Sequence, residues 1–225
     1  MIDGGDRDDH GYATSGPDNL LGTADDVNWQ GWLFIEQMIE FAINGNLNHA
    51  PKDILVVGAS STALSAIQSA AVVQGLSTTV RTGAALSSEN LNDYKVLYVP
   101  SDLNTGGGVS SSDLSILKQR KIDIQNFINN GGSAVALTEE ATPEPYAWLE
   151  LPLLFVIADA GNGMQPLHKT QAAINAGFTI SDAELSNGVP YHNTFIGPPD
   201  FNGLVPFVRD ASDRIITLGF SSLLR

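Results

Sequence analysis

Short apolar runs alternate with helix-like patterns between residues 53 and 138, and this alternation constrains the fold more than any other feature of the chain. The runs have the length and the β-branched content of buried strands. They cover residues 54–58, 77–82, 95–100 and 133–138. Because strands separated by helices pair in parallel through right-handed crossovers, the pattern predicts a doubly wound, mostly parallel α/β sheet.

The intervening segments carry helix start and stop signals. The run Ser60-Ser61-Thr62 can cap a helix with a small apolar face that stops at Gly75, and Ser110 with Asp113 has the character of a capping box. The second pattern predicts one long helix that closes at residues 130–132. Before them, residues 29–44 show helical spacing behind a candidate cap, Asn28. Residues 151–158 form a further apolar run, and residues 214–220 predict a closing strand.

The layout from the strand at 54–58 to the strand at 133–138 resembles the class I glutamine amidotransferase-like superfamily. The likeness rests on the run Val99-Pro100-Ser101-Asp102, the glycine run and long helix after it, and the turn Asn130-Gly131-Gly132 that leads into a strand. It covers roughly residues 53–141. In that superfamily, a helix ending in such a turn leads into the strand whose tip carries the nucleophile, so the resemblance implies a three-layer flavodoxin-like sandwich.

The resemblance places the nucleophile position at Thr138, where the catalytic enzymes of the superfamily have cysteine. This chain contains no cysteine. A threonine hydroxyl needs an adjacent general base, and two glutamates follow Thr138 in place of a glycine-flanked elbow. The departure favours a non-catalytic protein. The alternative is a hydrolase acting on an amide, ester or sugar derivative through Thr138, Glu139 and His192, with His168 as another candidate base.

The first 26 residues form a strongly acidic segment, with seven aspartates and no glutamate. Aspartate and glycine together suit a cation-binding loop, since calcium takes six to eight oxygens and the chain must bend tightly around it. Residues 6–11 match the opening of an EF-hand loop, but Pro17 stands at its closing position. A looser calcium loop therefore remains the expectation, against the alternative of a disordered acidic tail.

The aspartates rank in two sets as candidate calcium ligands. Asp18, Asp25 and Asp26 come first, because residues 16–26 are similar to short Asp/Gly calcium loops of secreted bacterial proteins. Asp3, Asp6 and Asp8 come second. Carboxylates this close raise one another's pKa, so a cation is expected to stabilise the segment. We accordingly divide the chain into an acidic cation-binding segment, 1–28, and one α/β domain, 29–225.

The overall charge disfavours some classes of binding partner. Twenty-five acidic and eleven basic residues give a formal charge of −14, which disfavours nucleic acid and anionic membrane surfaces. No apolar run reaches the roughly 18 residues of a membrane span. Acidic loops suit the calcium supply outside cells, so we expect an extracellular or cell-surface location. The start of the sequence shows no signal peptide, so such a leader is either absent or replaced by an initiator methionine.

These observations favour a structural or assembly protein that is stabilised by calcium and associates with itself as a homo-oligomer or filament. The hydrolase described above is the alternative. A third interpretation is a carbohydrate- or ligand-binding module using aromatic side chains. Its candidates are Trp29, Trp32, Tyr146 and Trp148.

Overall fold

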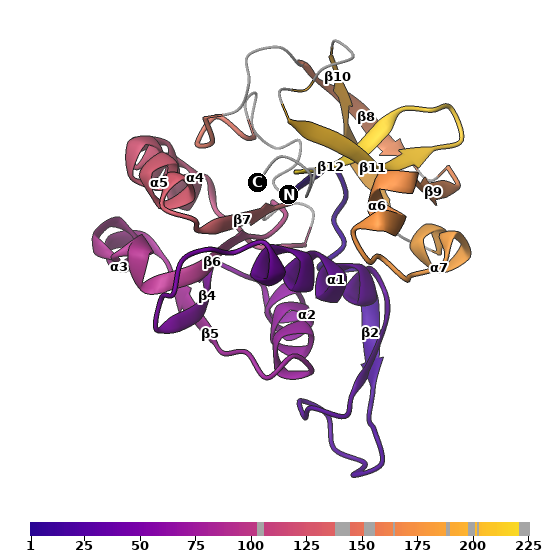
Figure 1. Ribbon diagram of the computed structural model, residues 1–225, viewed down its shortest axis with the longest axis horizontal. Helices are drawn as coiled ribbons and strands as arrows, with labels where there is room; N and C mark the ends of the chain where they lie inside the picture. Colours follow the sequence, from indigo (N-terminus) through magenta and orange to yellow (C-terminus); the bar gives the residue numbers. More distant parts are fainter. Residues whose placement is uncertain are drawn as a thin grey trace.

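A computed structural model gives the structure of residues 1–102, 106–137, 145–150, 156–163, 165–187, 190–197, 201 and 203–220, with the backbone alone at 156–162. The architecture is α/β. Helices flank a mixed sheet with a parallel and an antiparallel half, and a two-stranded arm projects from this body (Figure 1).

Helices and strands are interleaved along the chain, and each kind is numbered from the N-terminus. The α-helices are α1 (Gly31–Asn44), α2 (Ser61–Val72), α3 (Gly83–Ser88), α4 (Ser111–Gln119), α5 (Lys121–Asn129), α6 (Gln171–Asn175) and α7 (Asp182–Ser186), and a 3-10 helix η1 spans Leu91–Asp93. The strands are β1 (Ile2–Asp3), β2 (Gly11–Thr14), β3 (Val27–Gln30), β4 (Lys52–Val57), β5 (Thr78–Arg81), β6 (Tyr94–Val99), β7 (Ser133–Ala136), β8 (Val156–Gly163), β9 (Leu167–Lys169), β10 (Tyr191–Ile196), β11 (Leu204–Asp210) and β12 (Ile215–Phe220).

The parallel half confirms the strands expected from the apolar runs. Its order is β5-β4-β6-β7, with all three neighbouring pairs parallel. Strand β4, the first of these four along the chain, lies between β5 and β6. In open α/β sheets, a strand order of this kind places the ligand-binding crevice at the carboxyl ends of the two strands that correspond to β4 and β6.

The other half of the sheet is antiparallel, which the sequence pattern did not indicate. Strand β12 pairs antiparallel with β1, β10 and β11, and β8 and β9 extend this half through β10 and β11. The closing strand expected at 214–220 is confirmed as β12. Hairpin partners need only short connections, and residues 211–214 join β11 to β12 without a helix. A pattern of strand and helix alternation detects only the parallel half.

The chain begins inside the sheet. Strand β1 pairs in parallel with β7, where Ile2 lies opposite Ala136, and antiparallel with β12, where Asp3 lies opposite Thr217. It thus joins the parallel half to the antiparallel half. The first ten residues belong to the α/β body in the structure, whereas the expected boundary after residue 28 assigned them to a separate segment.

Two helices differ from their expected bounds. Helix α1 begins at Gly31 with Gln30 as its cap residue, whereas Asn28 lies in β3 and accepts a hydrogen bond from Ser69. The expected long helix is divided into α4 and α5 at Arg120. The two capping predictions are confirmed, since Ser60 Oγ accepts from Ala63 N–H and Ser110 Oγ from Asp113 N–H.

Buried apolar side chains form one cluster on each face of the sheet. One cluster joins α1 and α2 to Ile54, Val56 and Tyr98, and it extends to α6 and α7. The other joins α3, α4 and α5 to Leu55 and Val99 on the opposite face. Alternate residues of β4 thus face different helices, as expected for a strand covered on both sides. Within the described residues, no helix is both long and apolar enough to cross a membrane.

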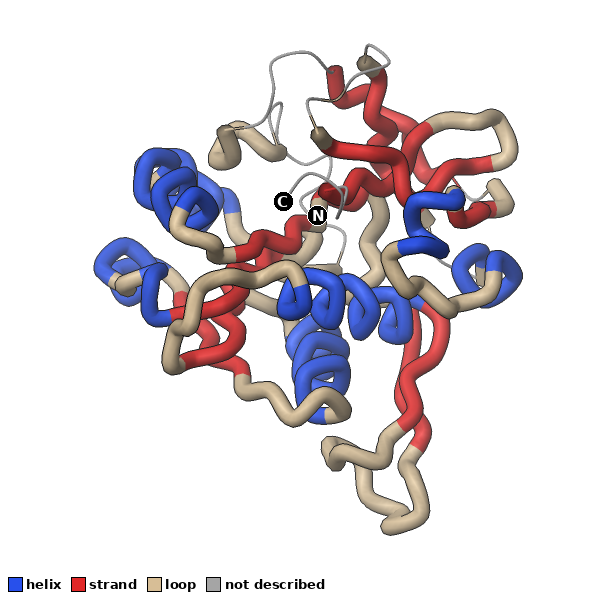
Figure 2. The backbone as a smooth tube through the Cα atoms, viewed as in Figure 1, coloured by secondary structure: helices blue, strands red, loops and turns tan. Residues whose placement is uncertain are grey.

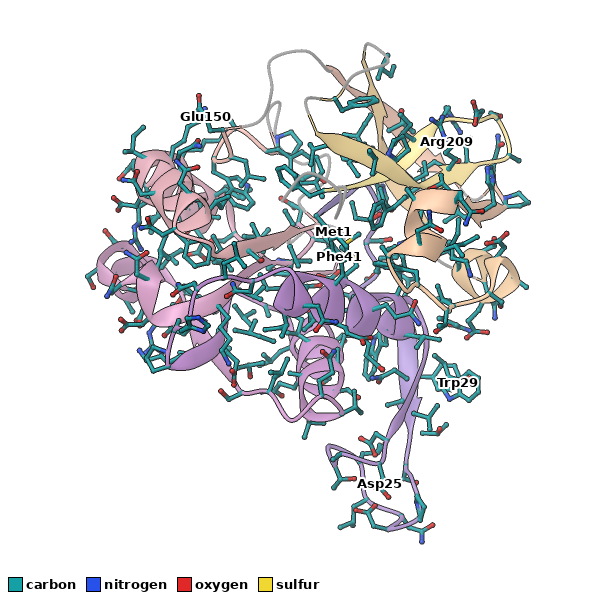
Figure 3. All side chains as sticks on the ribbon, viewed as in Figure 1. Met1, Asp25, Trp29, Phe41, Glu150 and Arg209 are labelled. Carbon is teal, nitrogen blue, oxygen red and sulfur yellow. The ribbon has the colours of Figure 1, made fainter. Side chains whose placement is uncertain are left out.

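The arm consists of β2, β3 and the loop between them, residues 15–26. The two strands pair antiparallel from Gly11 opposite Gln30 to Thr14 opposite Val27. The loop extends away from the body at the end of this hairpin (Figure 2), and Asp25 lies within it (Figure 3). The aspartates expected to form one cation-binding segment are therefore divided between the sheet and the end of the arm.

Candidate metal centre

Residues 4–10 cross the edge of the sheet where ligands of open α/β proteins bind. Because β1 is parallel to β7, the chain leaves β1 at the carboxyl ends of the parallel strands. Asp8 contacts Ser101, which lies just after the end of β6. The Asp8 carboxylate accepts hydrogen bonds from Ser101 N–H at 2.8 Å and from Ser101 Oγ at 2.6 Å. Asp8 and Ser101 are both fully buried. The acidic segment is thereby fixed over the crevice edge.

Asp9 lies against the glycine run that follows β6. A Cβ atom added to Gly106 would lie 2.0 Å from Asp9 Oδ2, and the φ angle of Gly106 is +103°. The residue therefore has to be glycine on both counts, since a side chain would displace the carboxylate and strain the backbone.

Asp6, Asp9 and His10 form a compact group of potential metal ligands. One carboxylate oxygen from each aspartate and one imidazole nitrogen lie within 4.8 Å of one another. The neighbouring His192 Nε2 lies 3.4 Å from Asp6 Oδ2, and His10 Nδ1 lies 3.5 Å from the same oxygen. In the described part of the chain, no other trio of acidic, histidine or cysteine side chains is grouped as closely.

The other oxygen of Asp6 is the most informative atom of this group. Asp6 is only 3% exposed, and its Oδ1 atom is shielded from solvent with no hydrogen-bond partner. A buried acceptor without a partner costs about 1–3 kcal/mol, and more when it carries charge. The carboxylate that contributes to the group therefore has an unused acceptor, which a bound cation would satisfy.

The electrostatics of the segment show an excess of buried negative charge. Burial raises the pKa of the Asp8 carboxyl to about 7, opposed by the hydrogen bonds from Ser101, and repulsion from Asp6 and Asp9 adds to the rise. The contact with Asp9 raises the pKa of His10 to about 9. His10 thus supplies positive charge beside the carboxylates, and any metal ion would replace its proton, since a ligating imidazole is neutral.

Asp3, a predicted calcium ligand, is engaged by protein groups. Its Oδ2 lies 3.1 Å from Arg7 Nε and accepts from Gly5 N–H, and its Oδ1 accepts from the Thr217 hydroxyl. Burial raises the pKa of the Asp3 carboxyl, and Arg7 opposes that rise. Asp3 therefore stabilises the start of the sheet with Arg7 and lies outside the Asp6 group.

The first-ranked calcium ligands lie together in the loop of the arm, where backbone amides bind them. Asp26 Oδ2 accepts from Gly22 N–H at 2.6 Å, and Asp25 Oδ2 accepts from Asp18 N–H at 3.2 Å. Asp18 Oδ1 in turn accepts from Leu20 N–H at 2.7 Å. These contacts order the loop without an ion, and Asp18, Asp25 and Asp26 do not form a group as close as that of Asp6.

The alternative catalytic set is only partly described. Thr138 and Glu139 lie outside the described residues. His192 lies on β10 and is buried next to Asp6, whereas the other candidate base, His168, lies on β9, opposite Arg209 of β11. The structure therefore brings one predicted catalytic residue, His192, to one predicted metal ligand, Asp6.

Two members of the metal group were not among the predicted ligands. Asp9 and His10 follow Asp6 by three and four residues, a spacing that returns side chains to one side when the chain turns. That spacing was a usable signal. By contrast, the approach of His192 depends on β10, which lies more than 180 residues away in the sequence.

The two carboxylates and one imidazole of this group are ligands typical of metal ions of intermediate softness. Imidazole nitrogen suits zinc, iron, nickel or copper, whereas calcium prefers a shell made of oxygens alone. Two carboxylates and a histidine can hold such an ion and leave a further position open. Asp9 and His10 are partly exposed, at 22% and 34% of their side chains, so an ion would enter from their side.

Comparison with known proteins gives no assignment. No protein-family model, curated protein or solved structure matches the chain. The functional conclusion consequently rests on the geometry of this chain.

Proposed function

We propose that this protein is a cation-stabilised structural protein of the secreted or cell-surface kind, in which Asp6, Asp9 and His10 hold a divalent metal ion. The observation that carries the proposal is the buried Asp6 carboxylate, whose Oδ1 has no partner although it belongs to a three-residue ligand group. An ion there would neutralise carboxylates that repel one another in a poorly hydrated place. It would fasten residues 4–10 across the sheet.

A structural role is favoured by what covers the sheet edge. In an α/β enzyme, substrate binds outside the carboxyl ends of the strands. Here Asp8 is bonded to Ser101 at that edge, and Asp9 contacts Gly106. The protein's own acidic segment therefore occupies part of the space that a substrate would need.

We also infer that the parallel half is a doubly wound unit of the amidotransferase-like kind. The order β5-β4-β6-β7 and the helices on both faces support this inference. Self-association into a homo-oligomer or filament and an extracellular location belong to the same proposal. Calcium outside cells would neutralise part of the charge of −14 that otherwise makes copies of the chain repel one another. Calcium remains the proposed ion for the loop with Asp18, Asp25 and Asp26, where only oxygen ligands are at hand.

Thermal unfolding after dialysis against EDTA tests the metal centre. At an ion concentration a hundredfold above Kd, binding stabilises by about 2.7 kcal/mol, which corresponds to roughly 5–10 °C in a chain of this size. We expect that shift with Zn²⁺ or Mn²⁺ and its loss in Asp6→Asn, an isosteric change. The matched control Asp213→Asn replaces an aspartate whose side chain is 80% exposed and should keep the shift.

The same measurement separates the two ions. Calcium should stabilise Asp6→Asn as well as it stabilises the unchanged protein, and the double variant Asp18→Asn/Asp25→Asn should lose the calcium effect alone. Superimposable curves with EDTA and with every ion would end the proposal. So would a full zinc shift in Asp6→Asn.

A hydrolase is the second candidate, favoured by the contact between His192 and Asp6. A carboxylate beside a histidine orients the ring and supports it as a general base. A panel of nitrophenyl esters, amides and glycosides would reveal such activity. Turnover that is lost in His192→Gln and retained in His168→Gln would favour the hydrolase over the structural protein.

A further inference from the structure

A second site lies between the arm and helix α2, and its wall contains none of the three residues of the Asp6 group. It is a cavity of about 670 Å³, within the size range of small-molecule sites. The arm contributes Ala13, Leu21 and Asp26, helix α2 contributes Ser65 and Gln68, and Trp32 and Thr78 lie at its ends. Elements that only pack against each other leave few gaps larger than a water molecule, so the space between the arm and α2 is large enough for a ligand.

The charged and polar groups of the wall limit the ligand. Among the described residues, no lysine, arginine or histidine lines the cavity, so an anionic ligand would find no positive charge there. The polar groups are hydroxyls, an amide and one carboxylate. Asp26 is only 7% exposed, and its Oδ2 already accepts two backbone N–H groups, from Gly22 and Thr23. Its Oδ1 accepts from the Thr23 hydroxyl at 3.4 Å and keeps a lone pair for a further donor from a ligand.

Two further groups are available to a ligand. Gln68 is exposed on α2, so its amide can offer both a donor and an acceptor. Trp32 presents an aromatic surface, and its indole N–H is buried without a hydrogen-bond partner. Because that nitrogen has essentially no exposed surface, a ligand in the cavity would contact the ring of Trp32 and not its N–H group.

Apolar side chains complete the wall. Leu21 from the arm, 67% exposed, faces this space together with Val72 and Leu76. A molecule that fits both the apolar and the polar part needs an apolar face and a rim of hydroxyl groups. Sugars have this arrangement, because the C–H groups of a pyranose ring gather on one face while its hydroxyls point outward.

We propose that the cavity between the arm and α2 binds a neutral saccharide, with Gln68 and Asp26 bonding its hydroxyls and Trp32 and Leu21 contacting its apolar face. The proposal is independent of the metal centre. It assigns a function to the arm: holding one wall of a binding site.

Saturation-transfer NMR and calorimetry on the full chain test the site. The probes are glucose, N-acetylglucosamine, maltose and cellobiose, with choline as a cationic control and glucuronate as an anionic one. We expect at least one neutral saccharide to bind with Kd below about 1 mM. Gln68→Ala should weaken that binding about fivefold to tenfold through loss of its hydrogen bonds. Choline and glucuronate should bind far more weakly.

Matched variants protect the test from effects on folding. Gln119→Ala removes an exposed glutamine at the end of α4 and should leave binding unchanged. Leu21→Ala should weaken binding, whereas Leu20→Ala, which removes the adjacent side chain, 61% exposed and outside the cavity wall, should not. Absence of binding for all four saccharides overturns the proposal. Equal binding of choline or glucuronate, or unchanged affinity in both Gln68→Ala and Leu21→Ala, also overturns it.

Discussion

Residues 3–10 and residues 16–26 are both rich in aspartate and glycine, yet they occupy opposite environments. In the first segment, Asp3 and Asp8 are fully buried and Asp6 is nearly so. The second segment lies in the exposed loop of the arm (Figure 2). One composition thus produces a buried crossing of the sheet and a solvated loop.

The partners of the carboxylates explain the difference. In the arm they bind backbone amides at most seven residues away, as Asp25 binds Asp18 N–H. In the buried segment they reach across the fold, Asp3 to Thr217 and Asp8 to Ser101. Local hydrogen bonds form wherever the loop closes, whereas the distant ones require the whole sheet. The comparison teaches that carboxylates become costly and informative only where folding removes them from water.

The largest expected effect comes from breaking the buried ion pair of the first segment. Arg7→Met leaves Asp3 without its cationic partner, and breaking such a pair costs about 3–5 kcal/mol in the free energy of unfolding. Arg7 also lies over the Phe34 ring, 5.1 Å from its centroid, a contact that methionine keeps only in part. Urea denaturation measures the change.

Two further variants locate the effect. The double change Arg7→Met/Asp3→Asn should recover part of the loss, because no uncompensated charge remains. Asp25→Asn in the arm should stay within about 0.5 kcal/mol of the unchanged protein. A loss in Arg7→Met no larger than that of Asp25→Asn would break the comparison.

Glycine substitutions give the next largest effect. A Cβ atom at Gly4 would lie 2.0 Å from the backbone oxygen of Asn193, so Gly4→Ala should destabilise by about 2–3 kcal/mol through overpacking. At Gly22 in the arm no atom lies within 4 Å, and only the φ angle of +85° opposes a side chain. Gly22→Ala should cost about 1 kcal/mol from that strain. Urea denaturation of the two variants measures the difference in stability. A larger decrease in stability for Gly22→Ala than for Gly4→Ala would contradict the prediction.

The smallest expected effect on stability comes from a carboxylate whose charge is already balanced by its neighbours. Glu89 accepts from the Tyr94 hydroxyl at 2.7 Å and pairs with Arg81 and Lys52, and these contacts, Tyr94 first, lower its pKa to about 2. Its stabilisation is therefore present above pH of about 4.5 and is lost as pH falls through about 2. Because Arg81 and Lys52 are partly exposed, we expect Glu89→Gln to cost only about 1 kcal/mol at pH 7.

The pH series is the control for this prediction. The difference in unfolding free energy between Glu89→Gln and the unchanged protein should shrink steadily between pH 4.5 and 2. A difference that is constant over that range would show that Glu89 contributes through packing and not through its charge.

Much of the parallel half could be predicted from the sequence. The buried strands β4, β6 and β7 appear as apolar runs, and Ser60 and Ser110 mark the starts of their helices, because capping and burial depend on residues close together in the chain. The division at Arg120 was missed, since both helices share one apolar pattern. The third interpretation also fails for Trp148 and Tyr146, which are buried in the core, with the Trp148 indole N–H bonded to Pro145 O.

The sequence by itself determined the α/β class, the capped helices and the concentration of aspartate near the start of the chain. Each follows from composition or from spacing within a few turns. Only the tertiary structure decided that Ile2 and Asp3 form a strand between β7 and β12. It also decided that Asp6 is buried and that its carboxylate contacts the His192 ring. The physical reason is that burial and pairing across the sheet depend on distant residues. The same residue type is therefore buried in the sheet crossing at Asp3, Asp6 and Asp8, whereas in the arm Asp18 and Asp25 are exposed and Asp26 is buried by its own loop.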